Sequence, residues 1–184
     1  MTADKKQTVP DDVKDFVAEV ESGARNPVGA VPKNILFFVP LIWTLFQLWY
    51  ASPLPFIFNI FVLNDTEARS IHLAFAMFLS YTAYPTFKSS PREYIPIQDW
   101  FLAVVAAFCS AYLFIFYEQM SARPGIPTTL DLVVGVIGLI LLLEATRRAL
   151  GPPLMVVAAV FLTYTFFGPY MPDVIAHKGA SLSK

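Results

Sequence analysis

The chain has 184 residues, of which 56% are hydrophobic and only 15% are charged, and its formal net charge is −1. Soluble domains average about 25% charged residues, so this composition excludes a soluble enzyme, a nucleic-acid-binding protein and a disordered tail. Positions 1–33 hold 11 of the 27 charged residues, and the 31 residues from Asn34 to Asn64 hold none. These numbers indicate an all-helical integral membrane protein with a polar N-terminal segment.

The polar segment at positions 1–33 is predicted to be cytoplasmic and to carry a short amphipathic helix. Val13, Phe16, Val17 and Val20 have the i, i+3, i+4, i+7 spacing of one helix face. The segment is too polar for a cleavable signal peptide, so the first hydrophobic stretch is expected to be an uncleaved anchor. Two interpretations of the helix stay open: docking against a protein, or a loosely ordered helix in solvent.

Five stretches are apolar enough to be considered as membrane-spanning helices, for which about 20 residues are needed. Four of them make up positions 34–150. The fifth is a shorter connecting span within positions 151–184, and it would lead into a periplasmic tail. The predicted spans are Asn34–Tyr50, Arg69–Tyr84, Ile97–Tyr117, Leu130–Ala149 and Pro152–Phe167.

The apolar stretch that contains the first span is too long for a single crossing. About thirty residues of helix would measure about 45 Å, against a hydrocarbon core of about 30 Å. The run Ser52-Pro53-Leu54-Pro55 should break the helix, because proline lacks a backbone N–H and clashes inside a helix. We expect Phe56–Leu63, which we name the shelf, to lie along the membrane interface. A single tilted and kinked helix is the alternative.

Polar residues at three helix starts support these boundaries. Asn64 is followed three residues later by Glu67, and Thr128 by Asp131, which is the spacing of a capping box. Asp99 lies in the first turn of the third span, where an acidic side chain complements the helix dipole.

The distribution of basic residues predicts the orientation of the spans. With the N-terminus in the cytoplasm, nine of the 13 lysines and arginines fall on cytoplasmic segments and four on outer segments. Five spans then place the C-terminus in the periplasm. If the fifth segment does not span, the C-terminus stays in the cytoplasm, and the count of basic residues barely distinguishes the two orientations. The nine are Lys5, Lys6, Lys14, Arg25, Lys33, Lys88, Arg92, Arg147 and Arg148, and the four are Arg69, Arg123, Lys178 and Lys184.

Motifs of catalysis and metal binding do not occur in the sequence. It has no G-x-G-x-x-G, P-loop or H-E-x-x-H pattern, and its two histidines are far apart. We expect no enzymatic activity, and no catalytic, substrate or metal site in this chain. Charged residues near the span ends remain as candidates for structure, assembly or lipid contact, because charge at membrane depth is costly and often functional.

The first candidate group is Arg69 and His72, which lie at i and i+3 on one face of the second span, near its outer end. This pair could bind an anion. The alternative is that the two side chains pack at headgroup level or pair with Glu67 or Asp131.

The second candidate group is Glu144, Arg147 and Arg148 at the end of the fourth span. The glutamate precedes the arginines by three and four residues, which is the favourable order for ion pairs within a helix. We expect a structural clamp that fixes the depth of this helix, with direct contact to a transported ion as the alternative. Asp99 and Asp131 complete the set of structural candidates.

Small residues predict where helices approach closely in the membrane. Ala103, Ala107 and Ala111 recur at intervals of four in the third span, and Gly135 and Gly138 lie in the fourth. Packing within the chain, or against another membrane subunit, is expected there.

Several motifs, in this order along the chain, resemble one family of membrane proteins. The similarity begins near Gln47 and covers nearly all of the remaining chain. It resembles the small, four-helix permease part of the fused TAXI-type tripartite ATP-independent periplasmic (TRAP) transporters. The motifs are Arg69-Ser70-Ile71-His72-Leu73-Ala74-Phe75, Ala83-Tyr84-Pro85, Ile95-Pro96-Ile97-Gln98-Asp99-Trp100, Arg123-Pro124-Gly125-Ile126-Pro127, Leu143-Glu144-Ala145-Thr146-Arg147-Arg148-Ala149-Leu150-Gly151, Gly168-Pro169-Tyr170-Met171-Pro172 and His177-Lys178-Gly179-Ala180-Ser181.

This resemblance implies a subunit of a secondary transporter in the bacterial inner membrane. Members of the family import organic acids with an ion gradient, typically sodium, after a periplasmic TAXI-type binding protein delivers the substrate. A large permease moves substrate and ions by an elevator movement, and the small permease braces its stationary scaffold. The fifth segment matches the connecting helix of fused members.

The partners implied are therefore the large permease, the periplasmic binding protein and membrane lipids, and no nucleic acid. Sodium would be used by the large permease, and a phospholipid at the subunit interface is a further expected ligand. We expect the large permease as a separate chain or as a continuation after Lys184, and the substrate and sodium sites within it. The charged motifs of the present chain are then scaffold and assembly positions.

Three alternatives stay open. The small subunit of the analogous tripartite tricarboxylate transporters has the same architecture. A self-contained channel or carrier would need polar residues near the middle of the membrane, where the sequence offers Thr44, Gln47 and Ser80. A lipid-binding scaffold would hold phospholipid with the shelf and with Arg147 and Arg148.

Overall fold

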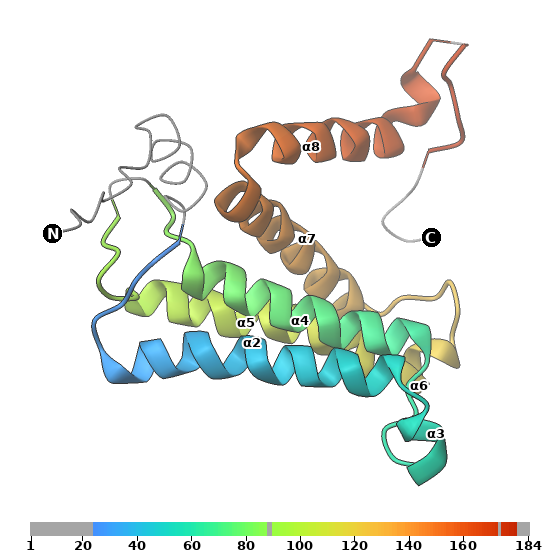
Figure 1. Ribbon diagram of the computed structural model, residues 1–184. Helices are drawn as coiled ribbons and strands as arrows, with labels where there is room; N and C mark the ends of the chain where they lie inside the picture. Colours follow the sequence, from blue (N-terminus) through green and yellow to red (C-terminus); the bar gives the residue numbers. More distant parts are fainter. Residues whose placement is uncertain (1–23, 88–89, 173, 180–184) are drawn as a thin grey trace, which may run out of the picture.

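The computed structural model describes residues 24–87, 90–172 and 174–179, and the regular structure in these residues is entirely helical (Figure 1). This confirms the predicted all-helical class. The predicted amphipathic helix at positions 13–20 lies outside the described residues. The elements are α2 (Ala30–Ala51), α3 (Leu54–Phe58), α4 (Asp65–Ala83), α5 (Ile97–Ile115), α6 (Tyr117–Ser121), α7 (Thr129–Leu150), α8 (Pro152–Phe167) and the 3₁₀ turn η1 (Gly168–Tyr170).

Four helices in the described part are long and apolar enough to cross a membrane, which indicates a multi-pass membrane protein. They are α2, α5, α7 and α8 extended by η1. The predicted second span is a helix, α4, but it is not among the four, since its first turns carry Asp65, Glu67 and Arg69. The predicted fifth segment is in the set by length and composition, and its crossing of the membrane stays a prediction.

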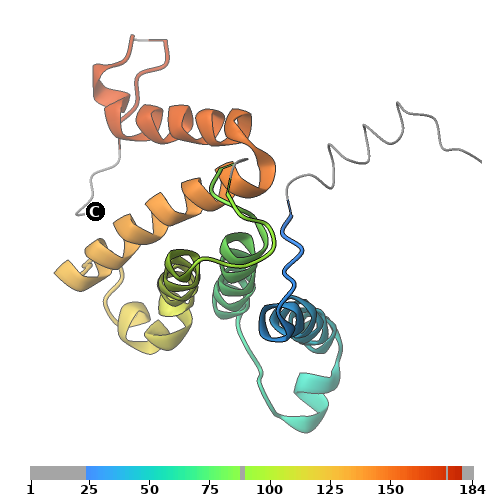
Figure 2. The ribbon, with the colours of Figure 1, turned by 90° about the vertical axis from the view of Figure 1, so that its left-hand side faces the viewer.

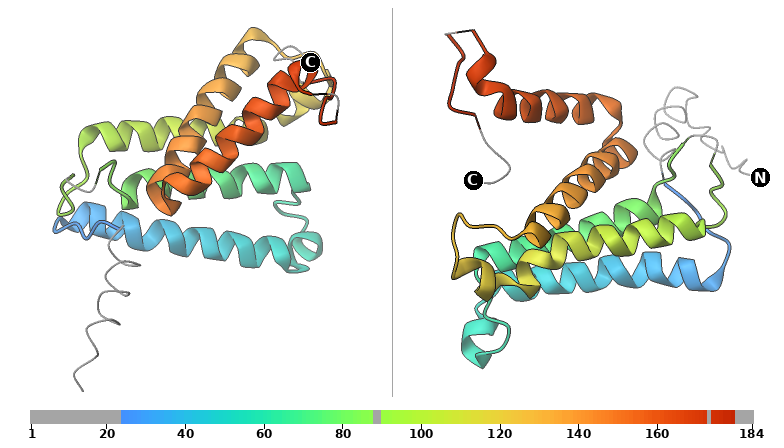
Figure 3. Two further views of the ribbon diagram at one scale, coloured as in Figure 1. Left: turned by 90° about the horizontal axis from the view of Figure 1, so that it is seen from above. Right: turned by 180° about the vertical axis from the view of Figure 1, so that it is seen from behind.

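The centre of the bundle is the antiparallel pair of α4 and α5, which have the most extensive contact of any two helices in the fold. α2 lies along one side of α4, and α7 crosses both helices obliquely on the other side (Figures 1 and 3). A core of large and small side chains joins α4, α5 and α7. Its fully buried members include Met77, Tyr81, Ala103 and Ala106. The small alanines let α5 approach α4 closely, as is common in lipid.

The predicted stripe of small residues is correct only in part. Ala103 is buried, but the buried positions that follow are Ala106 and Ser110, while Ala107 and Ala111 are half-buried on the flank of α5. The stripe therefore follows spacings of three and four residues, as the 3.6-residue turn of a helix requires.

The break predicted after the first span is present, so one continuous kinked helix is wrong. α2 ends at Ala51, where Ser52 donates through its backbone N–H and its hydroxyl to the Trp49 carbonyl at 3.2 and 2.8 Å. Pro53 then precedes the short helix α3. α2 also contains Pro40 but continues through it.

Both predicted capping boxes are confirmed. Asn64 Oδ1 accepts from the Glu67 N–H at 2.9 Å, and the Asn64 N–H donates to Glu67 Oε2 at 2.9 Å. At the start of α7, Thr128 Oγ1 accepts from the Asp131 N–H at 3.3 Å, and the Thr128 N–H donates to Asp131 Oδ2 at 2.8 Å. These bonds satisfy backbone N–H groups that have no partner within the helix.

The last helix, α8, turns away from the bundle (Figures 1 and 2). Gly151 has φ +86°, a conformation that favours glycine, and Pro152 begins α8 directly after it. The main neighbour of α8 is α7, and none of its residues is buried. A helix that is apolar on all sides is stable only where lipid or protein surrounds it.

Candidate functional site

The structure brings charged side chains from two helices, α5 and α7, and from the segment before α2 to one end of the bundle, the left-hand end in Figure 1. We name Arg25, Asp99, Glu144, Arg147 and Arg148 the charge network. Four of these residues were predicted as structural candidates or as part of a clamp. The contacts and burial of these five residues determine what this end of the protein could bind.

Asp99 is the centre of the charge network. Its side chain is 1% exposed, and its Oδ1 accepts from Arg148 Nη1 at 3.0 Å. Oδ2 accepts from Arg25 Nη2, and the Thr86 hydroxyl lies 3.5 Å from Oδ1. Asp99 lies in the first turn of α5 as predicted, and it also pairs with two arginines from other parts of the chain. A buried carboxylate needs charged partners because its desolvation is costly.

The predicted ion pairs of Glu144 with the two arginines are present, and their role as a clamp of helix depth stays a prediction. Arg147 approaches the carboxylate with two nitrogens, Nε to Oε2 and Nη2 to Oε1, both at 2.7 Å. Arg148 Nε donates to Oε1 at 2.8 Å. Arg147 also donates to the Thr86 carbonyl at 2.9 Å. Paired arginine–carboxylate bonds of this kind are among the strong ones in proteins, so the end of α7 is held in one geometry.

Arg25 is the residue of the charge network that the sequence analysis did not find. Its side chain is fully buried, and its Nη1 lies 3.3 Å from the carbonyls of Tyr81 and Thr82 in the last turn of α4. Its backbone N–H donates to the Ala83 carbonyl at 2.6 Å. The final carbonyls of a helix lack partners within it, so Arg25 caps α4 while it pairs with Asp99 of α5.

The charge network carries more positive than negative charge. Three guanidinium groups face two carboxylates, and the extra positive charge is spread over carbonyl oxygens and aromatic rings. The Arg148 guanidinium lies 4.5 Å from the centre of the Tyr81 ring, and that of Arg147 lies 5.7 Å from the Phe87 ring. Arg148 is 2% exposed, whereas Arg147 keeps 27% of its side chain exposed. Of the two, Arg147 alone has an edge that a lipid headgroup can reach.

Asp131 ties the same two helices at the opposite end. It accepts from the Tyr112 hydroxyl of α5 at 2.6 Å and from Arg123 Nη1 at 2.9 Å. The N-terminus of α5 is joined to the C-terminus of α7 through Asp99 and Arg148, and the reverse pair of ends is joined through Tyr112 and Asp131. α5 and α7 are therefore fixed to each other at both ends.

Arg69 and His72 have partners other than those predicted. Arg69 is 80% exposed and pairs with Asp65, one turn earlier, at 3.0 Å, so the predicted pairing with Glu67 or Asp131 is wrong. Glu67 caps its own helix instead, and Asp131 binds Arg123. The i, i+4 spacing places Asp65 directly beside Arg69 on the surface of α4.

His72 connects α4 to α2. Its Nδ1 lies 3.2 Å from Trp43 Nε1 and 3.0 Å from the Gln47 side-chain amide. Because an indole N–H can only donate, Nδ1 is the unprotonated acceptor nitrogen of the ring. Arg69 and His72 both border a surface hollow of about 350 Å³ between α2 and α4, together with Phe46 and Tyr50.

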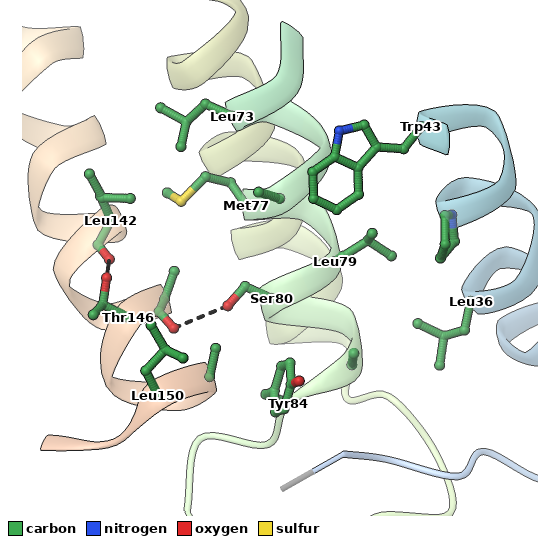
Figure 4. A pocket seen from close by; sticks show the side chains of 15 residues that line it. Leu36, Trp43, Leu73, Met77, Leu79, Ser80, Tyr84, Leu142, Thr146 and Leu150 are labelled. Atoms are coloured by element: carbon green, nitrogen blue, oxygen red, sulfur yellow. Dashed lines mark hydrogen bonds between the residues drawn. The ribbon is translucent and has the colours of Figure 1, made fainter. Parts of the chain in front are cut away.

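An apolar groove of about 490 Å³ runs between α2, α4 and α7 (Figure 4). Leu36 and Trp43 border it from α2, and Leu142 and Leu150 from α7. Ser80 points across the groove toward α7, where its hydroxyl donates to the Ala145 carbonyl at 3.1 Å. The lining therefore fits hydrocarbon, either an acyl chain or an apolar helix, and not a polar substrate.

No protein-family model, curated protein or solved structure that was searched matches this chain.

Proposed function

We propose that this chain is the small membrane subunit of a TAXI-type TRAP transporter in the bacterial inner membrane, with its N-terminus in the cytoplasm. In this proposal it braces a large permease that takes up organic acids with sodium, and a periplasmic binding protein delivers the substrate to that permease. The observation that carries the proposal is the use of the charge network: Arg148 pairs with both Asp99 and Glu144, so both carboxylates are engaged within the chain and not by a transported cation. The choice of family in this proposal is based on the resemblance in the order of motifs along the chain.

A stationary brace should be rigid, and the ties between α5 and α7 supply rigidity. One end of this helix pair is held by Asp99 with Arg148, and the other end by Tyr112 with Asp131. Tyr81 of α4 adds a tie to the middle of α7, because its hydroxyl donates to the Leu141 carbonyl at 2.8 Å. Sliding of α7 along the bundle would break all of these bonds together.

The polar residues that a self-contained carrier would need are already engaged. Thr44 donates to the Pro40 carbonyl of its own helix at 2.9 Å, Gln47 binds His72, and Ser80 binds the Ala145 carbonyl. Substrate sites of transporters gather converging polar groups near the membrane midplane. These three residues instead serve helix structure, which favours a supporting role over a carrier.

The apolar surfaces offer a place for the partner. α8 leaves the bundle with its apolar surface exposed, and the groove between α2, α4 and α7 is lined by aliphatic and aromatic side chains. In the proposed complex these surfaces lie against the large permease or the lipid that fills the joint.

Reconstitution tests the proposal. Three kinds of proteoliposome would be prepared: with this chain alone, with the proposed large permease alone, and with both. Each would have the periplasmic binding protein outside and an inward sodium gradient. We expect uptake of a labelled organic acid by the pair, with loss of uptake when either membrane component is left out. Uptake by this chain alone would make it a carrier, and full uptake by the permease alone would remove its role as a brace.

A further inference from the structure

The shelf is an exposed apolar surface between α2 and α4. Six consecutive or near-consecutive large side chains in it are between 47% and 74% exposed. It extends sideways from the end of the bundle where α2 stops and α4 begins, away from α7 and α8 (Figures 1 and 3). The six are Phe56, Ile57, Phe58, Ile60, Phe61 and Val62. Exposed apolar patches of this kind mark surfaces that meet another apolar phase.

The backbone of the shelf is turned so that these side chains point outward. Asn59 ends α3 in the left-handed conformation, φ +53°, and its N–H donates to the Pro55 carbonyl. Phe61 also has a positive φ, of +52°. This region disfavours a bulky side chain, and such strain persists only where the surroundings offset it. Within the described part of the chain, the contacts of this region are with the end of α2: Pro55 is buried, and the Phe58 ring stacks on Trp49 at 6.4 Å between centres.

The lengths of the neighbouring helices place the shelf at the membrane boundary. α2 has 22 residues, and a helix of this length measures about 33 Å, enough to cross a core of about 30 Å. α4 begins directly after the shelf with a capping box, and its first turns carry Asp65, Glu67 and Arg69. These charged groups need water or headgroups, so the shelf lies at the level where the bilayer changes from apolar to polar.

The irregular backbone of the shelf restricts further the depth at which it can lie in the membrane. Past α3 the chain from residue 59 to residue 63 is not helical. Irregular backbone that faces lipid does not occur within hydrocarbon, because its N–H and carbonyl groups would have no partners there. The exposed rings, on the other hand, are unfavourable in water. Only the boundary between headgroups and acyl chains satisfies both the backbone and the side chains.

From this placement we infer that the shelf is an in-plane membrane anchor, whose backbone lies among the lipid headgroups and whose rings enter the acyl boundary. It fixes the depth of the α2–α4 end of the bundle. No lysine or arginine occurs from Asn34 to Asn64, and Arg69 is paired with Asp65. The attraction is therefore apolar and independent of anionic lipid. The inference holds for the chain by itself and does not depend on the proposed transporter.

Depth-dependent quenching tests the inference in phosphatidylcholine vesicles that contain only this chain. Cys109 is the single cysteine, so a Cys109→Ala background receives one new cysteine that carries an environment-sensitive dye. The shelf variants are Ile57→Cys and Phe61→Cys. Ile140→Cys, on an exposed position of α7, reports the hydrocarbon core, and Glu93→Cys, in an exposed loop, reports water.

For both shelf variants we expect quenching about twofold stronger from lipid labelled near the headgroup than from lipid labelled near the chain terminus, with little quenching by aqueous iodide. The Ile140→Cys control should show the opposite depth preference, and the Glu93→Cys control should be quenched by iodide. Adding phosphatidylglycerol should leave the shelf values unchanged.

Each other outcome overturns the inference. Strong iodide quenching would place the shelf in water, and preference for the deep label would place it in the core. Protection from both quenchers would show that a second copy of the chain covers it. Lipid quenching that appears only with phosphatidylglycerol would show electrostatic attraction instead of an apolar anchor. If the Ile57→Cys and Phe61→Cys variants give the same quenching pattern, the result is not a local effect of one substitution.

Discussion

Arg148 Nη1 of α7 donates to Asp99 Oδ1 of α5 at 3.0 Å, and neither side chain is more than 2% exposed. The two residues are 49 positions apart in the chain. Arg25, from the segment before α2, binds the other oxygen of the same carboxylate. One buried acid thus joins three parts of the chain: the segment before α2, α5 and α7.

Replacing Asp99 with asparagine should strongly destabilise the protein. The amide keeps the size of the side chain but removes the carboxylate that pairs with the buried Arg25, and it leaves the buried Arg148 with Glu144 as its acidic partner. Breaking a buried pair in this way typically costs about 3–5 kcal/mol. The midpoint of thermal unfolding in detergent, followed by tryptophan fluorescence, should fall clearly for Asp99→Asn.

Asp65→Asn is the matched control for this substitution. It removes the partner of an arginine by the same chemical change, but the Arg69 and Asp65 side chains are 80% and 69% exposed. Exposed pairs contribute little to stability, typically less than about 1 kcal/mol. Equal shifts for the two variants would show that burial of the charge network does not matter.

Tyr81→Phe should remove a single tie between α4 and α7 and leave the core packed. The Tyr81 hydroxyl donates to the Leu141 carbonyl at 2.8 Å, and the ring is fully buried beneath Arg148. Loss of one such bond typically costs about 1 kcal/mol. Unfolding in increasing dodecyl sulfate should therefore begin at a lower detergent fraction than for the parent protein. Tyr170→Phe, at a position 86% exposed, should leave the curve unmoved; if it shifts the curve equally, loss of the buried bond is not the cause.

Local patterns in the sequence predicted the features that depend on neighbouring residues. The capping boxes and the pairing of Glu144 with Arg147 and Arg148 all act within one turn of helix, so their spacing is visible in the sequence. The break after α2 follows from Ser52 and the prolines near it. The ends of α5, α7 and α8 were also close to the predicted ones, because apolar runs and punctuating residues define them.

The pairing between helices could not be predicted in the same way. Arg25 and Asp99 are 74 positions apart, and their contact depends on how α4 and α5 pack. In helices that are apolar on nearly every side, hydrophobic spacing does not indicate which face meets a neighbour. For Arg69, Asp65 and Glu67 both lie within reach on the same helix. The capping box engages Glu67, and Asp65, one turn before Arg69, is the partner that the sequence analysis did not name.

Gly138→Leu should separate α5 from α7. A Cβ atom at Gly138 would lie 3.3 Å from Cys109 Cβ, which leaves no room for the rest of a leucine. Gly135→Leu makes the same change one turn earlier, where nothing lies within 4 Å of the added atom. Both changes raise helix propensity by up to about 1 kcal/mol, so the difference between them reports packing. Thermal unfolding should occur at a lower temperature for Gly138→Leu and at an equal or higher one for Gly135→Leu; a reversed order would contradict the observed approach of the helices.

The fold at the end of α8 should depend on Gly168, because the His177 ring packs against its Cα. His177 donates from its backbone to the Gly168 carbonyl at 3.2 Å, and its Nε2 lies 3.0 Å from the Tyr164 carbonyl. A Cβ atom at Gly168 would overlap the imidazole, so Gly168→Ala should displace His177 and release the segment that follows. Trypsin should then cut after Lys178, which is exposed, faster than in the parent protein. Tyr164→Phe, which loses only the hydroxyl bond to the Ile175 carbonyl, should accelerate cutting less. An unchanged cleavage rate in Gly168→Ala would mean that the packing of His177 on Gly168 does not hold this segment in place.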